Sequence, residues 1–207
     1  MRRVMPWCAV VLLASFAVCA YAQTVDMQTL VGALRQGGYV IVFRHGATNR
    51  DQADTDPLHP DNIAPQRLLS DKGKEVAQQV GAAFKKLGIP LGTVYTSKFN
   101  RAVETGKLVG GGEVTSTLDI TEGGLVVTPI ENDRRAEALK KMAGTMPEVG
   151  KNTLIVTHKP NILDAFGKDW FEVKEGEASI FKPDNTGKAV FVARVQAADW
   201  IKAASGN

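Results

Sequence analysis

Short apolar runs alternate with helix-like segments along this chain, and this alternation restricts the possible folds more than any other feature. Three of the runs cover residues 39–43, 93–96 and 153–157. A short apolar run of this kind is typical of a strand that is buried on both faces. Strands that alternate with helices form βαβ units, in which the strands run parallel. The sequence therefore predicts an α/β fold with a mostly parallel sheet and helices on both of its faces.

Capping residues and prolines mark the other predicted elements. Helices are expected over residues 27–34, 71–87, 97–109 and 131–142 and after Pro160, and further strands over residues 113–118, 178–181 and 189–195. Asp26 caps the first helix, and Ser70 or Asp71 caps the second. Residues 47–69 are polar and contain three prolines. A loop of this length in a compact domain is usually functional.

The N-terminal segment has the three parts of a secretory signal peptide. Arg2 and Arg3 precede an apolar stretch over residues 4–18, and Ala20 and Ala22 form an A-x-A cleavage site. The stretch is too short to span a membrane. We therefore expect a signal peptide over residues 1–22 and one domain over residues 23–207. We also expect export to the periplasm or the medium, without stable membrane association.

Cysteine usage and charge exclude several classes of protein. Cys8 and Cys19 both lie in the expected signal peptide, so the exported chain would form no disulfide. Val18 stands where a lipoprotein signal usually has Gly or Ala, which argues against a lipid on Cys19. The formal charge of +3 falls to about +1 without Arg2 and Arg3, which argues against a nucleic-acid partner. The three histidines lack an HExxH-like spacing, so we expect no metal or other cofactor. The sequence does not indicate the oligomeric state.

Three of the predicted strands end in residues that suit an anion. Arg44 and His45 follow the first strand, Ser97 follows the second with Arg101 one helical turn beyond, and His158 follows the strand over residues 153–157. If these strands are parallel neighbours, their carboxyl ends form one pocket. Two arginines and two histidines in one pocket are favourable only around an anion, and a phosphoryl group fits.

The chemistry of these side chains assigns roles within such a pocket. One histidine would attack phosphorus and become phosphohistidine. Arg44, Arg101 and the second histidine would neutralise the phosphoryl oxygens. A carboxylic acid would protonate the leaving alkoxide and then activate water.

Four motifs occur in a fixed order along the chain. They are Phe43-Arg44-His45-Gly46-Ala47-Thr48, Leu69-Ser70-Asp71-Lys72-Gly73, Ser97-Lys98-Phe99-Asn100-Arg101-Ala102-Val103-Glu104-Thr105 and Val156-Thr157-His158. The set resembles that of the histidine phosphatase (phosphoglycerate mutase-like) superfamily. The resemblance implies a three-layer α/β/α sandwich, with His45 as the phosphorylated nucleophile. It also implies a phosphate pocket completed by Arg44, Arg101 and His158.

The resemblance leaves several candidates for the general acid. In the mutase-like branch a glutamate lies some way after the second arginine, which fits Glu122, with Glu131 as a rival. In the acid phosphatase and phytase branch an aspartate directly follows the second histidine, where this chain has Lys159. Asp54 and Asp56 are further candidates, because they lie in the long loop that is able to cover the pocket.

These features together predict an exported, metal-independent phosphomonoesterase that acts on a small phosphorylated substrate through a phosphohistidine. Two alternatives stay open. One is a phosphotransferase or mutase, and the other is a non-catalytic protein that binds phosphorylated ligands. Because the chain has no large inserted cap domain, we expect substrate specificity to come from residues 47–69 and 119–129.

Overall fold

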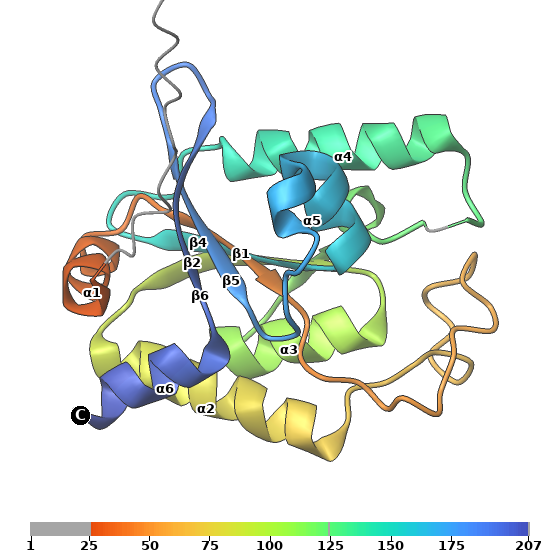
Figure 1. Ribbon diagram of the computed structural model, residues 1–207, viewed down its shortest axis with the longest axis horizontal. Helices are drawn as coiled ribbons and strands as arrows, with labels where there is room; N and C mark the ends of the chain where they lie inside the picture. The colour runs from red at the N-terminus through yellow and green to blue at the C-terminus, as the bar shows by residue number, and fades with distance from the viewer. Residues whose placement is uncertain (1–25, 124, 207) are drawn as a thin grey trace, which may run out of the picture.

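Figure 1 shows the computed structural model, which describes residues 26–123 and 125–206. The expected signal peptide lies outside the described residues. Within them, no helix is long and apolar enough to cross a membrane.

The described residues form a sheet with the strand order β3-β2-β4-β1-β5-β6. The strands are β1 (Val40–Arg44), β2 (Leu91–Ser97), β3 (Thr115–Thr117), β4 (Asn152–Thr157), β5 (Ala178–Pro183) and β6 (Ala189–Val195). The pairs β1 with β4, β4 with β2 and β2 with β3 are parallel. β5 is antiparallel to β1, and β6 is antiparallel to β5. The prediction of a mostly parallel sheet is confirmed.

Helices cover both faces of this sheet (Figure 1). They are α1 (Met27–Arg35), α2 (Asp71–Leu87), α3 (Asn100–Gly110), α4 (Pro129–Ala143), α5 (Lys159–Phe166) and α6 (Ala197–Ser205), with two short 3₁₀ turns, η1 (Leu118–Ile120) and η2 (Lys168–Trp170). α4 and α5 lie on one face, α2, α3 and α6 lie on the other, and α1 contacts α6. The predicted three-layer α/β/α sandwich is confirmed.

Each face of the sheet carries its own hydrophobic core. On the α2 and α6 side the core includes Val80, Phe84 and the fully buried Trp200, whose ring meets that of Phe84 edge-on at 4.9 Å. On the other side it includes Leu139 of α4 and Ile162 of α5. The sequence did not predict α6, because Trp200 is the single fully buried side chain of this short, alanine-rich helix, which is a weak periodic signal.

Caps explain where the helices around the site begin. Ser70, and not Asp71, caps α2, because its Oγ accepts the Gly73 N–H at 3.1 Å. α4 begins at Pro129, earlier than predicted, because the Thr128 side chain accepts the N–H of the residue at the third helical position.

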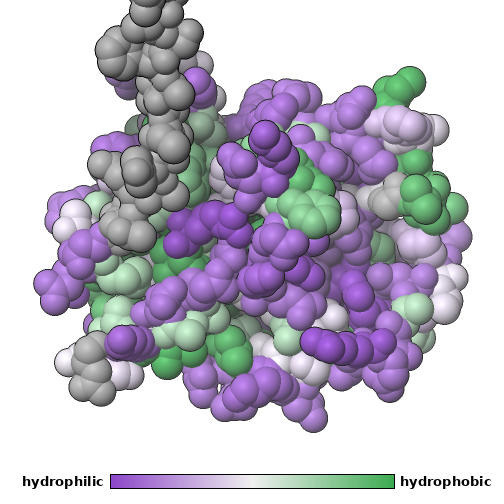
Figure 2. All heavy atoms as spheres, viewed as in Figure 1, coloured by the Kyte–Doolittle hydropathy of each residue, from purple (hydrophilic) through white to green (hydrophobic). Residues whose placement is uncertain are grey.

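Hydrophilic residues cover most of the face in Figure 2, and the hydrophobic groups at its upper right lie near the start of α4.

The loop between β1 and α2 is closed at its base and anchored from inside. A bridge pairs Thr48 with Leu69, so the two ends of the loop lie side by side. Gln66 is 3 % exposed, and its amide nitrogen donates to Pro60 O at 2.6 Å. Its amide oxygen accepts the Asn100 N–H at the start of α3 at 2.7 Å. The loop therefore has a defined conformation against the carboxyl end of the sheet.

Candidate active site

The three polar strand ends meet at one edge of the sheet. β4 lies between β1 and β2, and its register places Thr157 beside Arg44 and Val156 beside Thr96. As a result the residues that follow these strands come together, and the rings of His45 and His158 are 5.1 Å apart. The predicted convergence is confirmed.

His45 is buried with one ring nitrogen engaged. It is 2 % exposed, and its Nδ1 lies 2.8 Å from the carbonyl oxygen of Gly46. A carbonyl oxygen only accepts hydrogen bonds, so Nδ1 carries the proton and Nε2 keeps a free electron pair. Burial lowers the pKa of His45 well below its ordinary value, and the charges of His158 and Arg101 lower it further. The imidazole is therefore held neutral, which is its nucleophilic form.

His158 lies on the other side of the pocket and is fully buried. Its Nε2 is 2.6 Å from Ser97 Oγ, whereas its Nδ1 has no hydrogen-bond partner and lies 3.7 Å from Glu122 Oε1. Burial lowers the pKa of His158 well below its ordinary value, and the positive charge of Arg101 adds to the effect. Nδ1 is thus a buried polar atom that an incoming ligand can satisfy.

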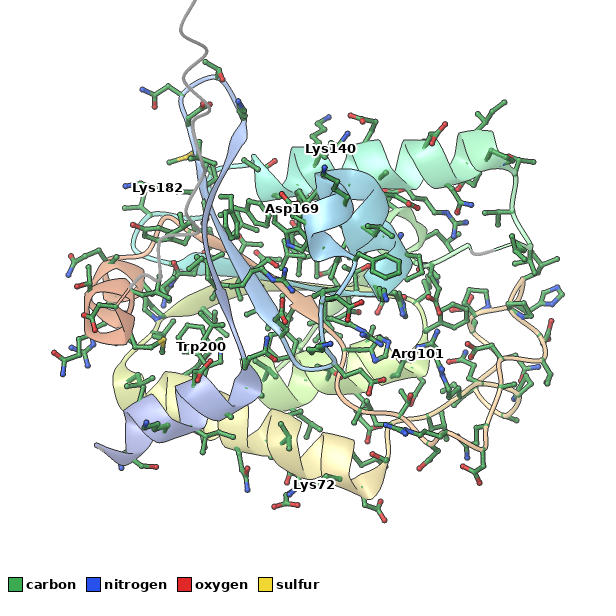
Figure 3. All side chains as sticks on the ribbon, in the orientation of Figure 1. Lys72, Arg101, Lys140, Asp169, Lys182 and Trp200 are labelled. Atoms are coloured by element: carbon green, nitrogen blue, oxygen red, sulfur yellow. The ribbon has the colours of Figure 1, made fainter. Side chains whose placement is uncertain are left out.

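Arg101, at the start of α3, is the central cation of the site (Figure 3). Its side chain is completely buried, and its guanidinium lies 4.4 Å from the centre of the Phe99 ring. One terminal nitrogen donates to Asp54 Oδ1 at 3.0 Å, and the other donates to Glu122 Oε1. Its charge is therefore balanced by two carboxylates.

Contacts with the segment after α5 hold the side chain of Arg44, at the end of β1. Nη1 donates to Val173 O at 2.8 Å, and Nη2 lies 3.6 Å from Glu175 Oε1. Its Nε is buried and has no hydrogen-bond partner. Burial lowers the pKa of Arg44, although a guanidinium remains charged in any accessible pH range.

The structure separates the four candidate acids. Glu122 and Asp54 both contact Arg101 and so belong to the pocket. Asp56 instead accepts from His59 at 2.6 Å within the exposed part of the loop. Glu131 pairs with the adjacent arginines of α4, which lower its pKa to about 2.

Arg67 belongs to the site and was missed by the sequence interpretation. Its main-chain N–H donates to Asp54 Oδ1 at 2.9 Å, and its main-chain carbonyl oxygen accepts from the Arg101 guanidinium at 3.4 Å. An arginine in a polar loop has no periodicity that distinguishes it from a solvent-exposed one. Its position directly after the buried Gln66 is what brings it to the pocket.

Two arginine side chains supply positive charge in this pocket. Over residues 26–123 and 125–206, no three His, Cys, Asp or Glu side chains are grouped so as to hold a metal ion. Arg44 and Arg101 instead supply fixed positive charge beside the neutral His45. Such a set of donors is suited to a phosphoryl group with charge on its three peripheral oxygens.

Comparisons with known proteins also support a pocket for a phosphoryl group. A family model described as the histidine phosphatase superfamily (branch 1) matches residues 40–123. No curated protein matches the chain.

Solved structures that share the fold include three phosphatases. The protein histidine phosphatase SixA, complexed with tungstate, has a TM-score of 0.54 at 19 % identity, over 77 % of this chain and 97 % of that one. A mycobacterial glucosyl-3-phosphoglycerate phosphatase with inorganic phosphate has a TM-score of 0.53 at 15 % identity, over 80 % and 99 % of the two chains. A phosphoserine phosphatase variant from Entamoeba histolytica with phosphoserine has a TM-score of 0.51 at 16 % identity, over 77 % and 97 %.

Proposed function

We propose that the chain is a phosphatase of the histidine phosphatase superfamily, whose model matches residues 40–123, and that it hydrolyses phosphomonoesters without a metal ion, through a phosphohistidine on His45. The observation that carries the proposal is the state of this side chain. Its Nδ1 donates to Gly46 O, its Nε2 keeps a free electron pair, its ring lies 5.1 Å from that of His158, and the charge of Arg101 lowers its pKa. A neutral imidazole beside fixed cations is an activated nucleophile for phosphorus.

In the first step, His45 displaces the alcohol. Arg44, Arg101 and Nδ1 of His158 bind the phosphoryl oxygens, and His45 Nε2 attacks phosphorus opposite the ester oxygen. An N–P bond forms as the P–O bond to the alcohol breaks. The leaving oxygen takes a proton from Glu122. The carboxyl group of Glu122 binds Arg101 and lies 3.7 Å from Nδ1 of His158.

In the second step, water releases the phosphate. Glu122, now a carboxylate, accepts a proton from a water molecule that attacks phosphorus. The P–O bond to water forms, the N–P bond breaks, and the electron pair returns to His45 Nε2. Inorganic phosphate leaves, and Glu122 is again protonated for the next cycle.

The substrate we propose is a small phosphorylated molecule. The solved relatives are named as a protein histidine phosphatase, a phosphoserine phosphatase and a glucosyl-3-phosphoglycerate phosphatase, and the groups in these names share a phosphoryl group as the part that is removed. Export is part of the same proposal and is supported by the sequence of residues 1–22. The near-neutral net charge supports a partner other than nucleic acid.

The test uses the chain from Gln23 onward with para-nitrophenyl phosphate and EDTA. Wild type should release phosphate, and His45→Ala should reduce kcat/KM by about a thousandfold or more, because the nucleophile is lost. His59→Ala is a matched control, since the His59 side chain is 74 % exposed and contacts Asp56, not the pocket. Acid-labile phosphate on the wild-type chain, absent from His45→Ala, would identify the intermediate.

Other outcomes would contradict the proposal. Loss of activity in EDTA would mean metal-dependent chemistry. Transfer of the phosphoryl group to an added alcohol, with little free phosphate, would indicate a phosphotransferase. Binding of phosphorylated ligands with no turnover of several esters, from acidic to mildly alkaline pH, would indicate a non-catalytic binding protein.

A further inference from the structure

The residue before Glu122 is buried and tightly hydrogen-bonded. Thr121 is 2 % exposed, and its hydroxyl donates to Thr117 O at 2.8 Å. The same hydroxyl accepts the main-chain N–H of Lys98, just after β2, at 2.9 Å. The main chain therefore reaches Glu122 from an anchored residue.

Arg135 of α4 binds the carbonyl group between Thr121 and Glu122. It is 8 % exposed, and its Nη1 donates to Thr121 O at 2.7 Å. This oxygen belongs to the planar peptide unit that ends at the Cα atom of Glu122, so a bond to it restrains the whole unit. Asn161 of α5 donates to the same oxygen at 3.4 Å, which is a longer and weaker bond. Of these two bonds, that of Arg135 restrains the peptide unit more strongly.

Glu131 keeps the Arg135 side chain in this position. Its Oε1 accepts from Arg135 Nε at 2.8 Å, one helical turn along α4. Hydrogen bonds from Arg134 and Arg135 lower the pKa of Glu131 to about 2, so this carboxylate stays ionised at neutral and mildly acidic pH. The charge of the buried guanidinium is therefore balanced, and its Nε and Nη1 both have partners.

The chemistry proposed for Glu122 depends closely on where this residue lies. A general acid must be within hydrogen-bond reach of the leaving oxygen. A displacement of about 1 Å in a reacting group is enough to lower the rate by about a hundredfold. Arg101 binds the carboxylate of Glu122, which restrains the end of the side chain. Bonds to the adjoining peptide unit restrain its other end, at the main chain.

We propose that Arg135 is a positioning residue for Glu122, and that it acts by holding the peptide unit from which the general acid extends. The proposal rests on the phosphatase function proposed above and adds a residue of α4, outside the four motifs, to its proton transfer. It also gives Glu131 a place in the site, as the residue that holds Arg135.

The experiment compares para-nitrobenzyl phosphate with para-nitrophenyl phosphate, which differ by one methylene group. The benzyl ester needs a proton on its leaving oxygen, whereas nitrophenolate leaves without one. Arg135→Ala should lower the ratio of kcat/KM for the benzyl ester to that for the phenyl ester by about tenfold or more. Arg135→Lys should recover part of the ratio, because its ammonium group keeps one donor for Thr121 O.

Two variants of α4 are the matched controls. Arg134→Ala removes the neighbouring arginine, whose half-exposed side chain binds Asp119 and Glu131. Leu139→Ala loosens the packing of the same helix, since Leu139 is fully buried, and removes no hydrogen-bonding group. Both should leave the ratio unchanged, even though Leu139→Ala lowers the melting temperature.

A double variant separates positioning from a general structural role. If Arg135 acts through Glu122, then Arg135→Ala added to Glu122→Gln should leave the ratio at its Glu122→Gln value. An unchanged ratio in Arg135→Ala, or a further tenfold fall in the double variant, would overturn the proposal while the phosphatase function stands. Absence of turnover of both esters by wild type would overturn the phosphatase function, and this role with it.

Discussion

The planar guanidinium of Arg101 binds two carboxylates, and the difference between them decides which one can transfer a proton in the reaction. Asp54 occupies one terminal nitrogen of the guanidinium, and Glu122 occupies the other. The two carboxylates differ in their second contacts. Asp54 also accepts the Arg67 N–H, whereas Glu122 also lies 3.7 Å from Nδ1 of His158. Glu122 is therefore the carboxyl group next to the proposed phosphoryl position.

This difference predicts distinct kinetics for two isosteric variants. Glu122→Gln should reduce the steady-state hydrolysis of an alkyl phosphate by about a hundredfold to ten-thousandfold, because proton transfer to the alkoxide is lost. With para-nitrophenyl phosphate, whose leaving group needs no proton, the same variant should show a burst of nitrophenol before slow turnover. Asp54→Asn should show no such burst. A burst in Asp54→Asn with ordinary turnover in Glu122→Gln would make Asp54 the acid.

Residues at strand ends could be predicted from the sequence, whereas the loop residues could not. A parallel strand fixes where the next residues lie, so the positions of Arg44, His45 and His158 follow from the strand pattern alone. Asp54 and Arg67 reach the pocket through the contacts of Gln66 with Pro60 and Asn100, which join segments far apart in the chain. No local pattern of side chains records such contacts.

At the level of elements, the packing of α2 on α3 depends on a close approach at Gly81. A Cβ atom at this position would lie 2.3 Å from the carbonyl oxygen of Leu108 in α3. By contrast, Gly32 in α1 is exposed, and no atom lies within 4 Å of a Cβ atom built there. The two glycines both lie inside helices, and their sequence context does not distinguish them.

Alanine at the two positions should therefore change stability in opposite directions. Gly81→Ala should lower the free energy of unfolding by about 1–3 kcal/mol, because backbone atoms of α3 must move. Gly32→Ala should raise it by about 0.5–1 kcal/mol, because alanine loses less entropy than glycine in a helix. Urea denaturation of the two variants and wild type measures both effects. Equal changes of the same sign would contradict the packing described here.

The elements themselves were predictable to different degrees. The buried strands and the helices with strong caps were predicted close to their observed bounds, since apolar runs and capping residues are local signals. The strand predicted over residues 113–118 is limited to Thr115–Thr117, because β3 is an edge strand with one partner. α6 was absent from the prediction, and its place becomes evident only when Trp200 packs on α2.

For the whole molecule, two buried histidines connect folding to pH. His45 and His158 both have a pKa well below the ordinary value, with burial as the largest cause. The unfolded chain takes up protons on these side chains as the pH falls through about 6.5, whereas the folded chain does not. Folding therefore becomes less favourable as the pH decreases below that value.

We expect the free energy of unfolding of wild type to fall between about pH 7.5 and about pH 5, by up to about 1.4 kcal/mol per pH unit for each histidine. His45→Asn should reduce this pH dependence, because the asparagine amide can still donate to Gly46 O but does not titrate. Urea denaturation at several pH values is the measurement. Val80→Ala is a control that should lower stability equally at each pH, since it removes apolar volume only. A pH dependence that is the same in His45→Asn and wild type would contradict the prediction.

The bridge between Thr48 and Leu69 separates changes in the loop from the position of the sheet. The two ends of the loop lie side by side at the Thr48–Leu69 bridge. A change in the length of the loop between them therefore does not move β1 or His45. Doubling such a loop adds only about 0.6 kcal/mol of closure entropy. Natural divergence, or a laboratory graft, can thus rebuild the exposed part of the loop around Asp56 and His59 for larger or differently charged molecules, while Asp54 and Gln66 keep their contacts with Arg101 and α3. The residue after β1 and its strand-end neighbours would keep their places while the repertoire of substrates changed.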